Sequence, residues 1–322
     1  MYSFLKRLTK KSSQRRVGVD FCAEGITLAI SDQRGNNTAM DCHFIPVADH
    51  SRFLAELKSS VQKYGLKDTP AFVVMPHDSY SLLQLSSPPM DKAELCASAK
   101  WRIREMVSYP VDEAVVDVFE FPESGQKGNE RIHYVVAARS KDVKNRIEMI
   151  RQSGLDLQVL DISELTIRNV ISMLKSNAEG AVIISFSSRS GLMAMIKNDE
   201  MYLARHLEVG LEDLVEDDPV VGLSLTPAAE SVALELQRSM DYFESKFMQA
   251  PLKKVFVYPP CQAVEMLIVK IRETVAMEIS VLDLTREIEN ISFSFGNHEE
   301  QNSLLAIGAA MRRQVEARLC SK

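Results

Sequence analysis

The fold is decided by residues 17–31, which read VGVDFCAEGITLAIS. Two runs of apolar and β-branched residues flank a short polar turn, a pattern typical of a β-hairpin. The same layout returns at residues 181–196, which read AVIISFSSRSGLMAMI. Because one such hairpin opens each half of the chain, the sequence predicts a duplicated α/β frame.

Length and composition limit the classes of protein to consider. At about 150 residues per domain, 322 residues correspond to two domains, each large enough to bury a core. The net charge of -6 argues against nucleic acid as the main partner, because phosphate binding depends on clustered Lys and Arg. Cysteines and histidines are scattered without metal-ligand spacing, so no metal site is predicted.

The start of the chain is basic. Residues 1–16 hold six Lys or Arg and no acid, among them Lys6, Arg7, Lys10 and Lys11. Such a segment can rest on an anionic membrane surface, or it can be a solvated and frayed terminus, and both interpretations stay open. The sequence has neither a long apolar run nor the apolar stretch of a signal peptide. We therefore expect a cytoplasmic protein.

After residue 80 the pattern of apolar and polar residues differs from that of the first hairpin. The pattern predicts a strand, a helix capped by Asp91, a strand pair and a helix ended by Gly154. We interpret this compact α+β unit as a domain inserted into the first one. The predicted organisation is a basic lead at 1–16, a first domain at 17–79 plus 155–180, the inserted domain at 80–154 and a second domain at 181–322. The last helix is expected over 303–319, and its return to the first domain stays an open alternative.

Several short motifs, in this order, resemble a known family. They are VGVD at 17–20, AKW at 99–101, YPVDE at 109–113, VDVF at 116–119, VVAA at 135–138 and VLD at 159–161. Together they look like the PilM proteins of type IV pilus assembly. Within that family, the short amino-terminal lead and degenerate turns are most similar to the branch that serves mannose-sensitive hemagglutinin (MSHA) pili. The resemblance implies an actin-like ATPase fold, with duplicated RNase H-like halves and a small α+β insertion domain in the first half.

The family resemblance also implies a nucleotide site, whose loops can be compared with this sequence. An actin-like site needs an Asp in each hairpin turn for Mg²⁺ and water, and a Gly beside it for phosphate approach. In the first turn Asp20 is kept, but Cys22 stands where the Gly belongs. In the second turn Ser185 stands in place of the Asp and Ser187 in place of the Gly.

A third loop departs from the pattern as well. Pro259 and Pro260 replace the Gly-Gly turn that would lie under the adenosine, and proline has neither the backbone N–H nor the required φ. Three degenerate loops in one site predict a protein that does not hydrolyse ATP, with no catalytic residues and no ATP or Mg²⁺ cofactor. The alternative is an ATP-binding or weakly hydrolysing protein whose nucleotide state gates partner binding.

The resemblance finally implies a binding partner. In the family, a groove between the first domain and its insertion holds the cytoplasmic tail of a PilN-like bitopic inner-membrane protein. Here that groove would lie near Trp101, Arg104, Tyr109 and Pro110, although Trp101 could instead close the core of the inserted domain. We expect a cytoplasmic scaffold, peripheral at the inner membrane, that also recruits other proteins of the pilus assembly platform.

Overall fold

The structure is a computed structural model, and it describes residues 15–34, 37–122, 131–174, 179–218, 222–248, 250–288, 291–294 and 302–312. Lys6, Arg7, Lys10 and Lys11 of the basic lead lie outside the described residues. So do residues 313–319 of the expected last helix.

A mixed six-stranded sheet forms the first half of the molecule, in the order β16-β3-β2-β1-β4-β8. Its strands are β1 (Arg15–Cys22), β2 (Gly25–Arg34), β3 (Asn37–Pro46), β4 (Pro70–Val74), β8 (Asp156–Asp161) and β16 (Ile291–Ser294). The first predicted hairpin is confirmed, because β1 and β2 pair antiparallel and β1 also pairs with β4 in parallel. The helices of this half are α1 (Phe53–Lys63), α3 (Ser140–Ser153), α4 (Ser163–Ile171) and α9 (Leu304–Ala310).

The second half is built on a five-stranded sheet in the order β11-β10-β9-β14-β15. Its strands are β9 (Ala181–Phe186), β10 (Gly191–Lys197), β11 (Glu200–Leu207), β14 (Lys254–Tyr258) and β15 (Glu278–Val281). The second predicted hairpin is confirmed as the antiparallel pair of β9 and β10. Around this sheet lie α5 (Leu211–Leu214), α6 (Pro227–Phe247), α7 (Gln262–Thr274), α8 (Leu284–Glu287) and the two-stranded ribbon of β12 (Val215–Asp218) and β13 (Gly222–Leu225).

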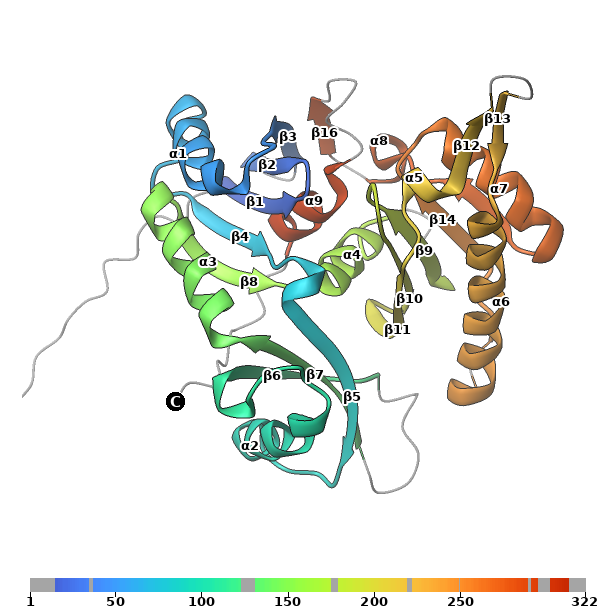
Figure 1. Cartoon of the computed structure of the whole chain (residues 1–322), viewed down its shortest axis with the longest axis horizontal. Helices are drawn as coiled ribbons and strands as arrows, with labels where there is room; N and C mark the ends of the chain where they lie inside the picture. The colour runs from blue at the N-terminus through green and yellow to red at the C-terminus, as the bar shows by residue number, and fades with distance from the viewer. Residues whose placement is uncertain are drawn as a thin grey trace, which may run out of the picture.

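A separate three-stranded sheet stands below the first one in Figure 1. It orders β5 (Tyr80–Ser87), β7 (Arg131–Arg139) and β6 (Ala114–Glu120), and α2 (Lys92–Arg102) covers it. The side chain of Asp91 accepts a hydrogen bond of 2.9 Å from the backbone N–H of Glu94, which is the predicted N-terminal cap. The helix ends at Arg102, and a 3-10 turn over Ile103–Glu105 follows it.

The helix after β7 packs differently from our expectation. We placed residues 141–153 in the inserted domain because they follow its last strand without a break. In the structure α3 lies beside α1 (Figure 1), and its fully buried Ile150 shares a core with Leu57 of α1 and Val73 of the first sheet. The inserted unit therefore comprises residues 80–139, because the apolar side of α3 complements the first sheet.

The inserted unit also contacts the second half through aromatic side chains. Tyr134 of β7 donates a hydrogen bond of 2.9 Å to the backbone carbonyl of Tyr202 in β11. The ring of Phe121 lies 5.3 Å from that of Tyr134 and 5.2 Å from that of Phe247 at the end of α6. These buried contacts hold the inserted unit against the second half.

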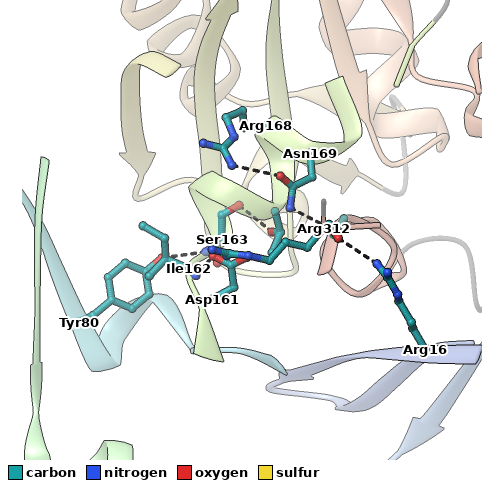
Figure 2. A network of polar contacts seen from close by, with 10 residues as sticks. Arg16, Tyr80, Asp161, Ile162, Ser163, Arg168, Asn169 and Arg312 are labelled. Atoms are coloured by element: carbon teal, nitrogen blue, oxygen red, sulfur yellow. Dashed lines mark hydrogen bonds and ion pairs between the residues drawn. The ribbon is translucent and has the colours of Figure 1, made fainter. Parts of the chain in front are cut away.

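The end of the described chain returns to the first sheet. β16 pairs with β3 in parallel, and α9 packs between α4 and strand β1. Figure 2 shows the polar contacts of this return: Arg312 pairs with the buried carboxylate of Asp161, and Arg16 donates a hydrogen bond of 3.1 Å to the carbonyl of Arg312. Asn169 donates another, of 3.0 Å, to the carbonyl of Gly308.

The close approach of α9 and α4 depends on a glycine. A Cβ at Gly308 would lie 2.2 Å from the carbonyl oxygen of Thr166, which is backbone and cannot rotate away. We expect Gly308→Ala to lower the free energy of unfolding by at least about 2 kcal/mol in denaturant titrations. The control Gly65→Ala meets no atom within 4 Å and should cost only about 1 kcal/mol, for its φ of 62°. Equal losses in the two variants would contradict the close packing.

Candidate functional site

A cavity of about 370 Å³ is lined by the turns of both hairpins. Asp20 and Cys22 come from the end of β1, and Ser185 and Ser187 come from the end of β9 and the turn after it. The fold thus brings together four of the six loop residues singled out in the sequence. Pro259 and Pro260 are not among the lining residues, although Tyr258 immediately before them is.

Burial controls the chemistry of the first turn. Asp20 is 8% exposed, and this burial raises the pKa of its carboxyl to about 7 against the opposing effects of the Phe21 backbone hydrogen bond and the Arg146 charge. Burial, together with the charge of Asp20, also raises the pKa of the Cys22 thiol to about 12. Cys22 is therefore a protonated thiol at neutral pH and does not act as a nucleophile.

The serine hydroxyl groups of the second turn have hydrogen-bond partners within the protein. The Ser187 hydroxyl lies 3.1 Å from the carbonyl oxygen of Ser190, to which it donates, and the Ser187 backbone N–H donates to the same oxygen at 2.8 Å. Across the cleft, the Ser188 hydroxyl donates to the carboxylate of Glu24. The turn supplies no carboxylate of its own to the cavity.

The residues proposed for a partner tail lie on the inserted unit. Trp101, in the last turn of α2, is 71% exposed, so the alternative in which it closes the core is wrong. Ile103, two residues later, is fully buried and fills that place. Arg104 is also exposed, and Met106, which the sequence analysis did not single out, is 54% exposed.

Tyr109 marks the border between the inserted unit and the first sheet. The guanidinium of Arg139, the last residue of β7, lies 5.0 Å from the centre of the Tyr109 ring, and α3 begins at the next residue. Burial raises the pKa of Tyr109, and among the described residues its hydroxyl has no hydrogen-bond partner. Pro110, beside it, is exposed and precedes the 3-10 turn Val111–Glu113.

Comparison with known proteins decides the family. A family model described as type IV pilus assembly protein PilM matches residues 51–217, which is more than half of the chain and includes the whole inserted unit. The chain belongs to the PilM family. No curated protein matches it.

Two solved structures show the fold. A structure described as the PilM-PilN type IV pilus biogenesis complex matches with a TM-score of 0.71 and 17% identity, over 92% of this chain and 97% of that one. The cytoplasmic domain of EpsL, an inner-membrane component of the type II secretion system of Vibrio cholerae, matches with a TM-score of 0.51 and 12% identity, over 93% and 95% of the two chains. The predicted actin-like fold class is confirmed.

In this PilM-family protein, a series of polar side chains runs from the cavity to the inserted unit. His206 of β11 lies 2.8 Å from one carboxylate oxygen of Glu164 in α4, and Tyr80 of β5 donates to the other at 2.7 Å. The ring of His77 stacks on that of His206 with centroids 5.4 Å apart, and both histidines line the cavity. Spacing along the sequence gives no sign of this pair, because no two histidines lie three or four residues apart.

Mg²⁺, which the actin-like fold implies, does not fit the chemistry of these residues. A hard cation prefers several ionised oxygen ligands, whereas the Asp20 carboxyl is buried with its pKa near 7 and faces the Arg146 cation. Among the residues that the structure describes, no group of three or more His, Cys, Asp or Glu could hold a metal ion. In the same residues, no helix is both long and apolar enough to cross a membrane.

Proposed function

We propose that this PilM-family chain is a scaffold of an inner-membrane pilus assembly platform and that it captures the cytoplasmic tail of a PilN-like bitopic protein. The 71% exposed Trp101 carries this proposal, because a large aromatic side chain left in solvent is a typical anchor for a partner. The family model spans the unit that carries it. The similar structure described as a PilM-PilN complex supports the choice of partner.

The exposed side chains suggest the chemistry of the tail. Apolar tail residues would pack against Trp101 and Met106, and an acidic or carbonyl group would pair with Arg104. Pro110 makes the backbone after Tyr109 rigid. This rigidity reduces the conformational entropy that the protein loses when the tail binds. The proposed occupant is therefore a short extended peptide with apolar and acidic side chains.

Co-elution tests the capture itself. The cytoplasmic tail of the PilN-like protein, fused to a carrier protein, should co-elute with the full chain in size-exclusion chromatography as a one-to-one complex. The same carrier with a scrambled tail is the control. Separate elution of chain and tail at concentrations of about 50 µM, where even a weak specific complex with Kd near 1 µM would persist, would contradict the proposal.

We also propose that the scaffold does not turn over nucleotide. The internal hydrogen bonds of the second turn and the buried, weakly acidic Asp20 support this proposal. We expect no phosphate release and a dissociation constant for Mg-ATP no tighter than about 1 mM, which is about -4 kcal/mol. The alternative, in which ATP gates partner binding, is favoured by the existence of the cavity. A micromolar dissociation constant for Mg-ATP by calorimetry would contradict the proposal.

We also propose which type of pilus the protein serves. The degenerate turns support MshI, the branch of the family that serves MSHA pili. Deletion of the gene in its own bacterium should then abolish MSHA pili on the cell surface and leave other type IV pili unchanged. Loss of a different pilus would contradict the assignment.

We propose a location on the cytoplasmic face of the inner membrane, where the basic lead touches anionic lipid. Each Lys or Arg near such a surface contributes about 1 kcal/mol, and the attraction weakens with salt. Changing Lys6, Arg7, Lys10 and Lys11 to Gln should therefore reduce co-sedimentation with vesicles rich in phosphatidylglycerol. Co-sedimentation that is equal for the variant and the unchanged chain would contradict the contact.

A further inference from the structure

Arg146 is a cation inside the cavity that the sequence analysis did not identify. It lies in α3, and its guanidinium carbon is 4.0 Å from the centre of the Phe21 ring in the first turn. Arg146 lines the cavity together with the carboxylates of Asp20 and Asp78. A guanidinium on an aromatic face is held in place by cation–π attraction and by contact of the two planar groups.

Burial and two nearby carboxylates have opposite effects on the pKa of Arg146. Its Nη1 donates a weak hydrogen bond to Met149 Sδ at 3.9 Å, and among the described residues no carboxylate lies within 4.0 Å of it. Burial lowers the pKa of Arg146, whereas the charges of Asp20 and Asp78 raise it. Arginine stays charged under such conditions, so the cavity contains a permanent positive charge.

We propose that Arg146 is the resident cation of this cavity and that it takes the place of the divalent metal expected beside Asp20 in an actin-like fold. The reason is electrostatic: a carboxylate in a partly buried site needs a nearby positive charge, and its Coulomb energy grows as the dielectric constant falls. A guanidinium fixed on a helix supplies that charge without dehydrating an ion. The cavity then needs no Mg²⁺.

The position of Asp78 extends the role of Arg146 to the inserted unit. Asp78 lies in the short turn His77–Ser79 that leads directly into β5, the first strand of that unit. The Arg146 charge therefore links the first hairpin turn to the start of the inserted unit. This electrostatic link holds the start of the inserted unit near the first hairpin turn. The proposed partner-binding unit therefore needs no nucleotide to keep its position.

Melting temperatures test the proposal with no partner present, so its outcome is independent of tail capture. The melting temperature of the unchanged protein should be the same in EDTA and in millimolar Mg²⁺. Arg146→Gln should lower it by at least about 3 °C, whereas Arg146→Lys, which keeps the positive charge, should lower it by less than half of that amount. The control Arg151→Gln, on the same helix and 77% exposed beside Glu148, should change it by less than about 1 °C.

A double-variant cycle identifies Asp20 as a partner of this charge. In an Asp20→Asn background, the loss caused by Arg146→Gln should fall to less than half, because the buried carboxylate is gone. Equal losses in both backgrounds would overturn the proposal, as would a rise in the melting temperature of the unchanged protein with Mg²⁺. If Arg146→Gln alone does not fold, folding of the double variant supports the proposal, and its failure to fold overturns it.

Discussion

Trp101→Ala should weaken binding of the partner tail by more than about 1 kcal/mol, which is at least a fivefold rise in the dissociation constant. The indole is 71% exposed in the free protein, so burial against a tail would remove a large apolar area from water. Calorimetric titration with a synthetic tail measures the change. Val269→Ala is the matched control, since Val269 is 60% exposed on α7 and far along the chain from the inserted unit.

The stability of the Trp101 variant separates binding from folding. Because the side chain is exposed, Trp101→Ala should leave the melting temperature within about 2 °C of the unchanged protein. Arg104→Glu, also at an exposed position, should weaken binding while keeping the fold. If the tail binds the Trp101→Ala and Val269→Ala variants with equal affinity, the face around Trp101 is not the binding site.

Asp20→Asn should stabilise the protein, and the gain should grow with pH. The folded pKa of about 7 lies above the reference value of 3.8, so the folded state holds a proton that the unfolded state releases between these values. Raising the pH through this window therefore lowers the free energy of unfolding, by on the order of 1.4 kcal/mol for each pKa unit. Asparagine stays neutral and does not carry this cost.

Denaturant titrations at several pH values measure the effect. The difference between Asp20→Asn and the unchanged protein should be small near pH 4 and should reach a few kcal/mol above pH 7. Asp156→Asn, at an exposed position on β8, is the control and should show no such trend. A difference that does not vary with pH would mean that Asp20 ionises in the fold without cost.

The two hairpins could be predicted because their signal is local. Alternating apolar strands around a short polar turn determine β1 with β2 and β9 with β10, and the duplication then predicts that their turns meet. Asp91 as a helix cap was predictable for the same reason, since capping depends on the next three residues.

Other features depend on packing between distant segments. An amphipathic pattern shows that residues 140–153 form a helix, but not which core it covers, and so α3 was placed in the wrong unit. Arg146 was missed as a consequence, because nothing in its own helix points to Phe21. The exposure of Trp101 was equally undetermined, since a single aromatic residue in a short helix can face either the core or solvent.

The most direct test of the account is the dissociation constant of the synthetic partner tail, measured for the unchanged protein with and without Mg-ATP. Arg146 is the proposed cation of the cavity, and the proposed binding face lies on the inserted unit. We therefore predict saturable one-to-one binding without nucleotide and a dissociation constant that stays within about twofold when Mg-ATP is added, a change of less than about 0.5 kcal/mol. Binding that appears only with Mg-ATP, or no binding under either condition, would contradict it.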